Sequence, residues 1–95
     1  MTKKELVKAV AEKAGIKERI ARAAVNGLIE VITEALKKEE PVGIRGFGTF
    51  LMKERRPRIG VNLRTGEKIK IPAKLVPVFR PGKDLKEATE RVIKG

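Results

Sequence analysis

Apolar side chains in the first 40 residues recur at helical spacing. Over the first fourteen residues they fall on one face, and Thr2 and Glu5 stand at capping-box spacing ahead of them. Gly15 predicts the end of this helix, because glycine readily adopts the left-handed conformation found there. A second helix is predicted over residues 17–38. Its apolar residues spread beyond a single stripe, which indicates that it packs against more than the first helix.

After Pro41 the apolar period changes to two, which predicts strands. Residues 42–44 and 49–52 flank the stretch GFG at 46–48 in the order strand, turn, strand. Glycine permits the unusual backbone angles of a tight turn while the large side chain between the glycines points back into the apolar interior. We therefore predict that the chain's three aromatic residues are core residues that cover the sheet face over the helices: Phe47, Phe50 and Phe79.

Two further extended segments, residues 53–61 and 67–79, surround the turn sequence NLRTG. Asn62 suits the entry of this turn, and Gly66 suits a positive φ at its exit. The flanking segments are poor in large apolar residues, so they predict a long two-stranded ribbon with little to bury. Such a ribbon is marginally stable alone in water, which predicts an arm that is mobile until a polyanion orders it.

Within the ribbon, Lys68 and Lys70 alternate with Ile69 and Ile71, which predicts one basic face and one apolar face. We expect the isoleucines to stiffen the ribbon. The prolines of these segments are tolerated only at edges and bulges, so the ribbon has two edges and no further strand. They are Pro57, Pro72 and Pro77.

A short final helix is predicted over residues 84–94, with Glu87 and Arg91 spaced for an ion pair. The element order is then α-α-β-β-β-α, without an internal repeat. This order predicts one α+β domain over residues 1–95. Its parts are a helical part at 1–40, to which the family resemblance described below assigns dimerisation, a sheet and arm at 41–81, and the C-terminal helix at 82–95.

The net charge of +11 is unevenly distributed. Residues 1–40 carry only +2, the usual pattern of a salt-bridged helical surface, whereas residues 53–74 carry +6. A strongly basic segment with almost no core favours a polyanionic partner over a merely solvated surface. The eight basic side chains of this segment are Lys53, Arg55, Arg56, Arg58, Arg64, Lys68, Lys70 and Lys74.

Several functions are disfavoured by the residue types that are absent. Without Cys or His, disulfides and thiolate zinc sites are excluded. Ser and Tyr are also absent and Asp84 is the only aspartate, so we expect neither an enzyme nor a cofactor, metal or small-molecule substrate. No long apolar stretch or signal peptide is present, which predicts a cytoplasmic protein with no membrane partner. The abundance of Lys, Arg and Glu with no Ser or Gln suggests a heat-loving source.

A set of motifs in the second half runs in register without gaps: GFGTF at 46–50, Arg55, Arg58, Gly60, N-x-x-T-G at 62–66, Ile69, Ile71, V-P-x-F at 76–79 and G-K-x-L-K at 82–86. These residues resemble the bacterial histone-like HU and integration host factor family, and HU most. The resemblance implies an intertwined dimer with a helical body and a three-stranded antiparallel sheet extended into a long β-ribbon arm. Two such arms would reach around double-stranded DNA, lie in its minor groove and bend it, which places the protein at the nucleoid.

One departure from the family pattern lies at the arm tip. The family usually has R-N-P-x-T-G there, with an arginine and a wedging proline, whereas this chain has Val61 and Leu63 in those places. Leucine is also an apolar wedge, so we expect Leu63 to take the role. Leucine is more flexible than proline, so the departure bears on the sharpness of the kink more than on binding. The predicted DNA-binding residues are Lys53, Arg55, Arg56, Arg58, Asn62, Leu63, Arg64, Lys68, Lys70, Lys74, and Lys83 and Lys86 of the last helix.

Alternatives to a non-specific, DNA-compacting protein stay open on the sequence. A sequence-preferring subunit like integration host factor has the same pattern, and the partner chain is either identical or a sister chain. Double-stranded RNA is a less favoured target, since it is bound by shape, and single-stranded targets need aromatic platforms that this chain lacks. A third alternative is a basic arm that grips an acidic protein.

Overall fold

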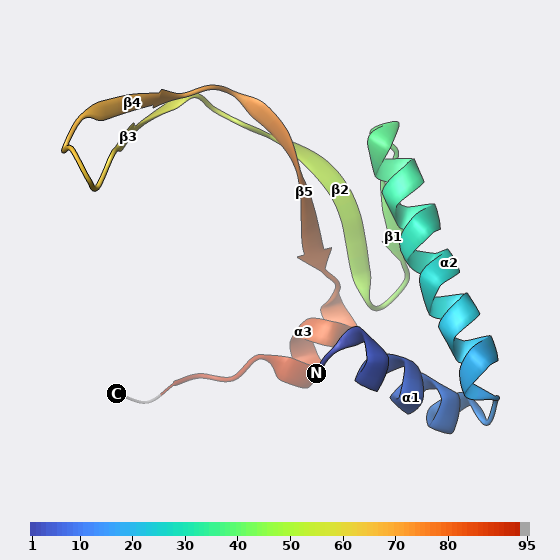
Figure 1. The fold of residues 1–95 in the computed structure, drawn as a ribbon. Coiled ribbons are helices and arrows are strands. Elements are labelled where there is room, and N and C mark those ends of the chain that lie inside the picture. The colour runs from blue at the N-terminus through green and yellow to red at the C-terminus, as the bar shows by residue number, and fades with distance from the viewer. Residues whose placement is uncertain (94–95) are drawn as a thin grey trace. The chain divides into compact units, whose positions relative to one another are not determined.

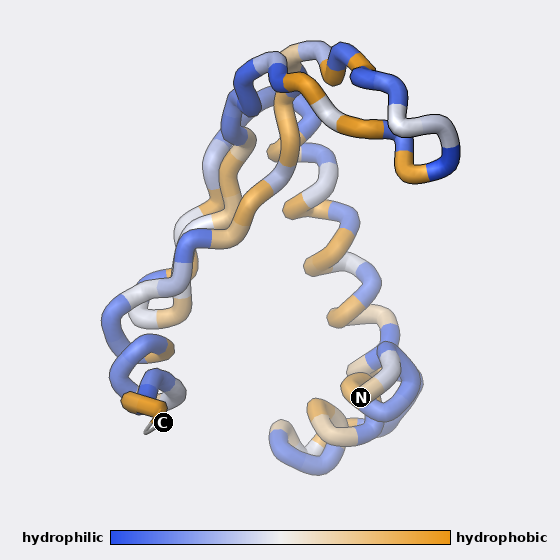
Figure 2. The backbone as a smooth tube through the Cα atoms, turned by 90° about the vertical axis from the view of Figure 1, so that its left-hand side faces the viewer, coloured by the Kyte–Doolittle hydropathy of each residue, from blue (hydrophilic) through white to orange (hydrophobic). Residues whose placement is uncertain are grey.

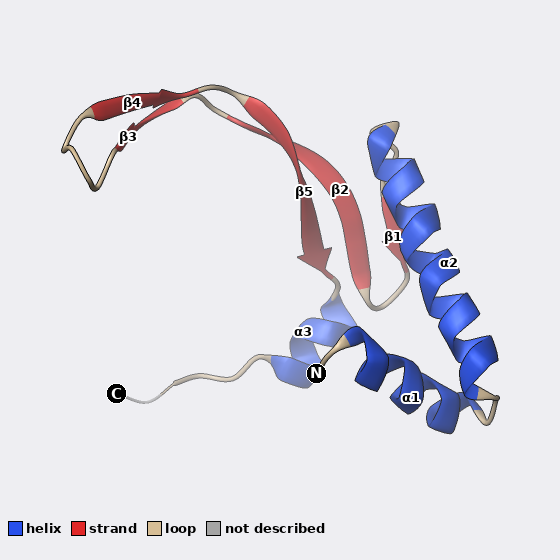
Figure 3. Cartoon of the chain, viewed as in Figure 1, coloured by secondary structure: helices blue, strands red, loops and turns tan. Residues whose placement is uncertain are grey.

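The computed structural model describes residues 1–93, and within that range the chain forms three helices and five strands of an α+β fold (Figures 1 and 3). The chain divides into two compact units, Met1–Ala35 and Leu36–Gly95. In chain order the elements are α1 (Lys3–Ala14), α2 (Glu18–Lys37), β1 (Val42–Ile44), β2 (Gly48–Arg55), β3 (Arg58–Val61), β4 (Lys68–Ile71), β5 (Lys74–Pro81) and α3 (Lys83–Thr89).

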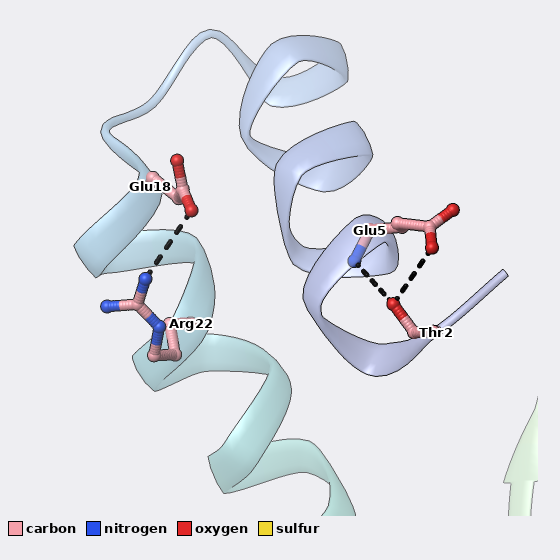
Figure 4. Close-up of polar contacts among 4 residues, drawn as sticks. All are labelled: Thr2, Glu5, Glu18 and Arg22. Carbon is pink, nitrogen blue, oxygen red and sulfur yellow. Dashed lines mark hydrogen bonds and ion pairs between the residues drawn. The ribbon is translucent and has the colours of Figure 1, made fainter.

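Helix α1 begins and ends where the sequence predicts. Thr2 is the N-cap, and its hydroxyl oxygen accepts a hydrogen bond from the Glu5 N–H at 3.2 Å (Figure 4). The Thr2 hydroxyl donates to the Glu5 carboxylate at 3.1 Å, in place of the backbone contact of a full capping box. Gly15 ends the helix at φ 68°, and its N–H donates to the Ala11 carbonyl. Both predicted ends are confirmed.

Helix α2 is one residue shorter at each end than predicted, and much of its apolar surface is exposed. Its first turn carries an ion pair between Arg22 and Glu18 at 3.4 Å (Figure 4). Further along, Leu28 is 53% exposed and Val31 is 66% exposed. The described part of the chain therefore leaves uncovered the wide apolar face that the sequence predicts. The buried apolar core consists of Val7, Ala11, Ala21 and Val25.

In the second unit, β1, β2 and β5 form an antiparallel sheet in the order β1-β2-β5. Phe50 pairs with Val42 on one side and with Phe79 on the other. The sheet requires glycine at the start of β2. A Cβ atom on Gly48 would lie 2.5 Å from the Phe79 ring and 2.6 Å from the Arg80 carbonyl oxygen.

The three phenylalanines form one aromatic cluster, but within this chain they are not the buried core that the sequence predicts. The Phe79 ring lies between the other two, with centroid distances of 5.2 Å to Phe47 and 4.8 Å to Phe50. Phe47 is 43% exposed and Phe79 is 37% exposed. The prediction fails for the single chain because the described residues do not cover this aromatic surface.

The GFG turn has a role that was not predicted from the sequence: it caps helix α3. The Phe47 carbonyl accepts the Gly82 N–H at 2.8 Å, and the Gly46 carbonyl accepts the Leu85 N–H at 3.3 Å. These N–H groups belong to the N-cap residue and the first turn of α3, where no intrahelical acceptor exists and Gly82 supplies no side-chain cap. The turn therefore fixes the start of α3 against the sheet.

Helix α3 is shorter than predicted. It ends at Thr89, because Glu90 adopts the extended conformation at φ −69° and ψ 141°. Arg91 therefore lies beyond the helix, and Glu87 is paired instead with Lys83 at 3.8 Å. The helix that was expected to reach residue 94 lacks packing for its last turn, since Val92 is 93% exposed. Lys94 lies outside the described residues.

Strands β3 and β4 form a separate two-stranded antiparallel sheet, the β3–β4 ribbon of residues 58–71. The predicted ribbon is continuous, but the ladder stops at the Arg55–Lys74 pair and resumes at the Arg58–Ile71 pair. Pro57 and Pro72 lie in this gap, and a proline lacks the N–H that a ladder needs. β5 is an edge strand, as Pro77 within it predicts.

Candidate nucleic-acid interface

The basic side chains of residues 53–74 all lie on the surface. Each of the eight is exposed, and among the described residues no carboxylate lies within ion-pair distance of any of them. Hydrophilic and hydrophobic stretches interleave along the strands that carry them (Figure 2). Exposed, unpaired cations at this density create a positive potential that attracts polyanions. Lys83 and Lys86 of α3 are also exposed, and Lys83 makes the ion pair with Glu87 described above.

The two faces of the β3–β4 ribbon are both mixed, which corrects the prediction of one basic and one apolar face. Cross-strand partners lie on the same face of an antiparallel pair. Lys68 pairs with Val61, and Lys70 pairs with Ile59. The lysines therefore share their face with apolar side chains, of which Ile59 is 69% exposed and Val61 is 59% exposed. The prediction used the alternation of β4 alone, whereas the composition of a face also depends on the register with β3.

The opposite face of the ribbon carries Arg58, Gly60 and the two isoleucines of β4. Ile71 lies over Gly60, because a Cβ atom on Gly60 would stand 2.9 Å from the Ile71 Cδ1 atom. This close approach leaves both residues partly buried. It is consistent with isoleucines that stiffen the ribbon, and that role stays a prediction.

Four of the cations gather at the gap between the two sheets. Arg55, Arg56, Arg58 and Lys74 line a cavity of about 290 Å³, the junction cavity, together with Ile71, Pro72 and Val76. The four charges repel one another across this space. An anion seated there would relieve the repulsion, so the junction cavity suits a phosphate group.

The tip turn, residues 62–67, is closed by hydrogen bonds within the turn itself. The Asn62 N–H donates to the Glu67 carbonyl at 2.8 Å, and the Gly66 N–H donates to the Asn62 carbonyl at 2.7 Å. Gly66 has φ 72°, as the sequence predicts for the turn exit. Between these anchors Leu63 is 98% exposed and Arg64 is exposed. The tip therefore presents an apolar side chain next to a cationic one.

Two features of this surface were not predicted from the sequence. Ile59 and Val61 lie beside the lysines, although the sequence shows both only as apolar residues in a segment with little to bury. Asn62 was expected only as a turn former and DNA contact, whereas its side-chain oxygen accepts the Arg64 N–H at 2.9 Å. The signal for the second was present, since asparagine often bonds the backbone two residues ahead.

Metal-binding clusters and membrane-spanning helices are absent from residues 1–93. No group of three or more His, Cys, Asp or Glu side chains in that range could hold a metal ion. None of the helices formed by those residues has the length and apolar character needed to cross a membrane.

Comparison with known proteins identifies relatives along nearly the whole chain. The family described as bacterial DNA-binding protein matches residues 1–90. DNA-binding protein HU from Geobacillus stearothermophilus is 48% identical over 90 residues, which cover 95% of this chain and 100% of that protein. DNA-binding protein HU from Thermotoga maritima is 49% identical over 87 residues, covering 92% of this chain and 97% of that protein. Both relatives are named as DNA-binding proteins.

Solved structures of HU share the fold. A cocrystal structure of Anabaena HU with DNA matches with a TM-score of 0.87 and 44% identity, covering 93% of this chain and 96% of that one. The structure of HU from Thermotoga maritima matches with a TM-score of 0.65 and 38% identity, covering 93% and 97%. With its sequence and its fold matched over nine-tenths of their length, this chain belongs to the bacterial DNA-binding protein family, among the HU proteins.

Proposed function

We propose that this protein is a non-catalytic architectural protein that binds double-stranded DNA in the minor groove with little sequence specificity, bends it and compacts it in the nucleoid. The proposal rests on one observation. Residues 53–74 carry eight exposed, unpaired cations, and an exposed leucine lies at the end of the ribbon. The similarity to an HU–DNA cocrystal structure supports the same partner.

Affinity in this proposal comes from phosphates. Lys and Arg side chains that neutralise phosphates release condensed counterions, which gives strong, salt-dependent binding that does not read sequence. The cations of the junction cavity, Arg55, Arg56, Arg58 and Lys74, would contact the backbone. Lys53, Arg64, Lys68 and Lys70 would extend the contact along the groove, and Lys83 and Lys86 would bind phosphates beside the body. Arginine inserted in a narrow minor groove responds to its width and potential, and not to a unique base code.

Bending in this proposal comes from Leu63. An apolar side chain inserted between base pairs unstacks a step and kinks the duplex, at a cost of about a few kcal/mol per step. Full burial of a leucine side chain is worth about 1.5–3 kcal/mol. Leu63 is 98% exposed in the free chain, so insertion between base pairs would bury nearly all of its surface and yield nearly all of that free energy. The two magnitudes are similar, which makes a leucine wedge energetically feasible.

The protein acts as an intertwined homodimer in this proposal, with one ribbon arm from each subunit. Only four apolar side chains are buried in the described chain. Leu28 and Val31 of α2 are exposed, and so are Phe47 and Phe79 of the aromatic cluster. A partner subunit would cover these surfaces and give a two-fold molecule with two arms. In this arrangement residues 1–40 form the dimerisation part, residues 41–81 the sheet and arm, and residues 82–95 the C-terminal segment.

A competition experiment tests the choice of partner. The protein is bound to a labelled random-sequence DNA duplex, and unlabelled duplex DNA, A/T-rich DNA, nicked DNA, duplex RNA and polyglutamate are added in turn. We expect all three DNA competitors to displace the label, with similar strength for random and A/T-rich duplexes. Better competition by RNA or polyglutamate than by DNA would overturn the proposal, and a single preferred DNA sequence would favour a site-specific subunit.

Removing the same charge from the ribbon and from a helical surface tests whether binding depends on where the cations lie. Replacing Arg55, Arg56 and Arg58 with Gln should weaken duplex binding strongly. The same change at Lys8, Lys13 and Arg19 removes an equal charge from an exposed helical surface. It should have a much smaller effect, because that surface is not part of the interface.

A further inference from the structure

The tip turn contains a hydrogen bond that spans the leucine. Asn62 Oδ1 accepts the Arg64 N–H at 2.9 Å, so a ring closes around the backbone of the residue between them, Leu63. A second side-chain bond, from the Glu67 N–H to Thr65 Oγ1 at 3.2 Å, lies on the exit side of the turn and does not span the leucine. The two bonds are of the same class, but only one constrains Leu63.

Apart from the backbone hydrogen bonds that close the turn, no contact orders the leucine, because its side chain is not packed against other residues. With 98% of its surface exposed, its direction is set by its own backbone and not by packing. Leucine does not fix its own φ as proline does, so a leucine in a turn leaves several backbone conformations accessible. Asn62 is itself partly buried, and its backbone N–H and carbonyl both make the hydrogen bonds that close the turn. Because the Asn62 backbone is fixed in this way, the side chain that reaches Arg64 starts from an anchored position.

We propose that Asn62 is a positioning residue: its side-chain oxygen holds the Leu63 backbone in one conformation before DNA binds, so that the leucine enters the duplex without first being ordered. This inference rests on the proposed function and deepens it, since it assigns the direction of the wedge to one hydrogen bond. Pre-ordering a binding group lowers the entropy lost on binding. The role differs from a direct contact, in which the Asn62 amide NH₂ would donate to a base.

Three variants separate these roles. Asn62→Ala removes the acceptor. Asn62→Asp keeps an oxygen that can accept the Arg64 N–H but loses the NH₂ donor and adds a negative charge. Thr65→Ala is the matched control, because it removes the other side-chain bond of the turn. All three lie far in sequence from the buried core of Val7, Ala11, Ala21 and Val25, so we expect them to melt at the wild-type temperature.

The first readout is amide hydrogen exchange of Arg64 in the free, full-length protein. Asn62→Ala should speed this exchange by roughly fivefold, the factor that one modest hydrogen bond is worth. Asn62→Asp and Thr65→Ala should leave it near the wild-type rate. Equal exchange in wild type and Asn62→Ala would overturn the inference, whatever the protein does to DNA.

The second readout is the bend angle of a doubly labelled duplex, measured by energy transfer at saturating protein. We expect Asn62→Ala to bend DNA less than wild type, while Asn62→Asp binds more weakly, because of its charge, but keeps the wild-type bend once saturated. A bend in Asn62→Asp as small as in Asn62→Ala would assign Asn62 to direct contact and overturn the positioning role. If wild type leaves DNA straight, the proposed function fails together with this inference. If wild type and Asn62→Ala bend DNA equally, only the inference fails.

Discussion

At the scale of single residues, Leu63 is the side chain on which bending depends. Leu63→Ala should reduce the bend angle more than the affinity, because phosphate contacts supply most of the binding and the wedge supplies the kink. Energy transfer across a labelled duplex measures the bend, and anisotropy measures the affinity. Val61→Ala is the control, since Val61 is also exposed, at 59%, but lies on the strand and not at the tip. Equal bending by wild type and Leu63→Ala would remove the wedge role.

Gly48 should be the glycine least tolerant of substitution among those that the sheet contains. Gly48→Ala places a Cβ atom 2.6 Å from the Arg80 carbonyl oxygen, a backbone atom that cannot move without breaking the β2–β5 ladder. We expect a loss of about 1–3 kcal/mol in the free energy of unfolding, the usual range for overpacking. Gly43→Ala is the control, because its nearest neighbour would be Thr49 Oγ1 at 3.6 Å, an ordinary contact. Chemical denaturation of both variants measures the difference.

At the scale of elements, the cations on residues 53–74 should make binding steeply salt-dependent. A plot of log K against log salt is expected to fall with a slope of about −0.9 for each phosphate neutralised. Replacing Arg55, Arg56, Arg58 and Lys74 with Gln should flatten this slope by about three to four, if each contacts one phosphate. The same slope in both proteins would show that the junction cavity does not contact DNA.

The element boundaries show what local sequence can and cannot predict. Thr2 and Gly15 define α1 because caps depend on neighbours within four residues. Asn62 and Gly66 define the tip turn for the same reason. The faces of the β3–β4 ribbon depend on register, which alternation in β4 alone does not contain. The gap in the ribbon depends on two prolines, Pro57 and Pro72, coming opposite each other, which requires the same register.

The candidate site was predictable as a set of residues but not as a geometry. Charge counting located the basic segment, and the structure adds that its cations are unpaired and that four of them share one cavity. The cap that the GFG turn provides for α3 was not predictable, because residues 46 and 82 are distant in sequence. Burial of the phenylalanines was predicted from their type, whereas their exposure in this chain depends on a surface that the chain does not supply.

At the scale of the whole molecule, the exposed apolar face of α2 predicts a dimer. Leu28 is 53% exposed in the single chain, so Leu28→Lys should cost little in a monomer. In a dimer it would bury a charge, and we expect dissociation with loss of folding cooperativity. Sedimentation equilibrium and the concentration dependence of Tm measure both effects, since the melting of a dimer depends on protein concentration. Val92→Lys is the control, at 93% exposure, and a folded wild-type monomer at micromolar concentration would contradict the dimer.

In the proposed function, exposed cationic ribbons that end in an apolar residue bind duplex DNA and bend it. The most direct test is the end-to-end distance of a short random-sequence duplex, labelled at both ends, measured by energy transfer as the wild-type protein is added. We expect the distance to shorten to a plateau as the duplex saturates, and added salt to reverse the change. A saturated complex in which the duplex keeps its free length, or no binding at low salt, would contradict the proposed function.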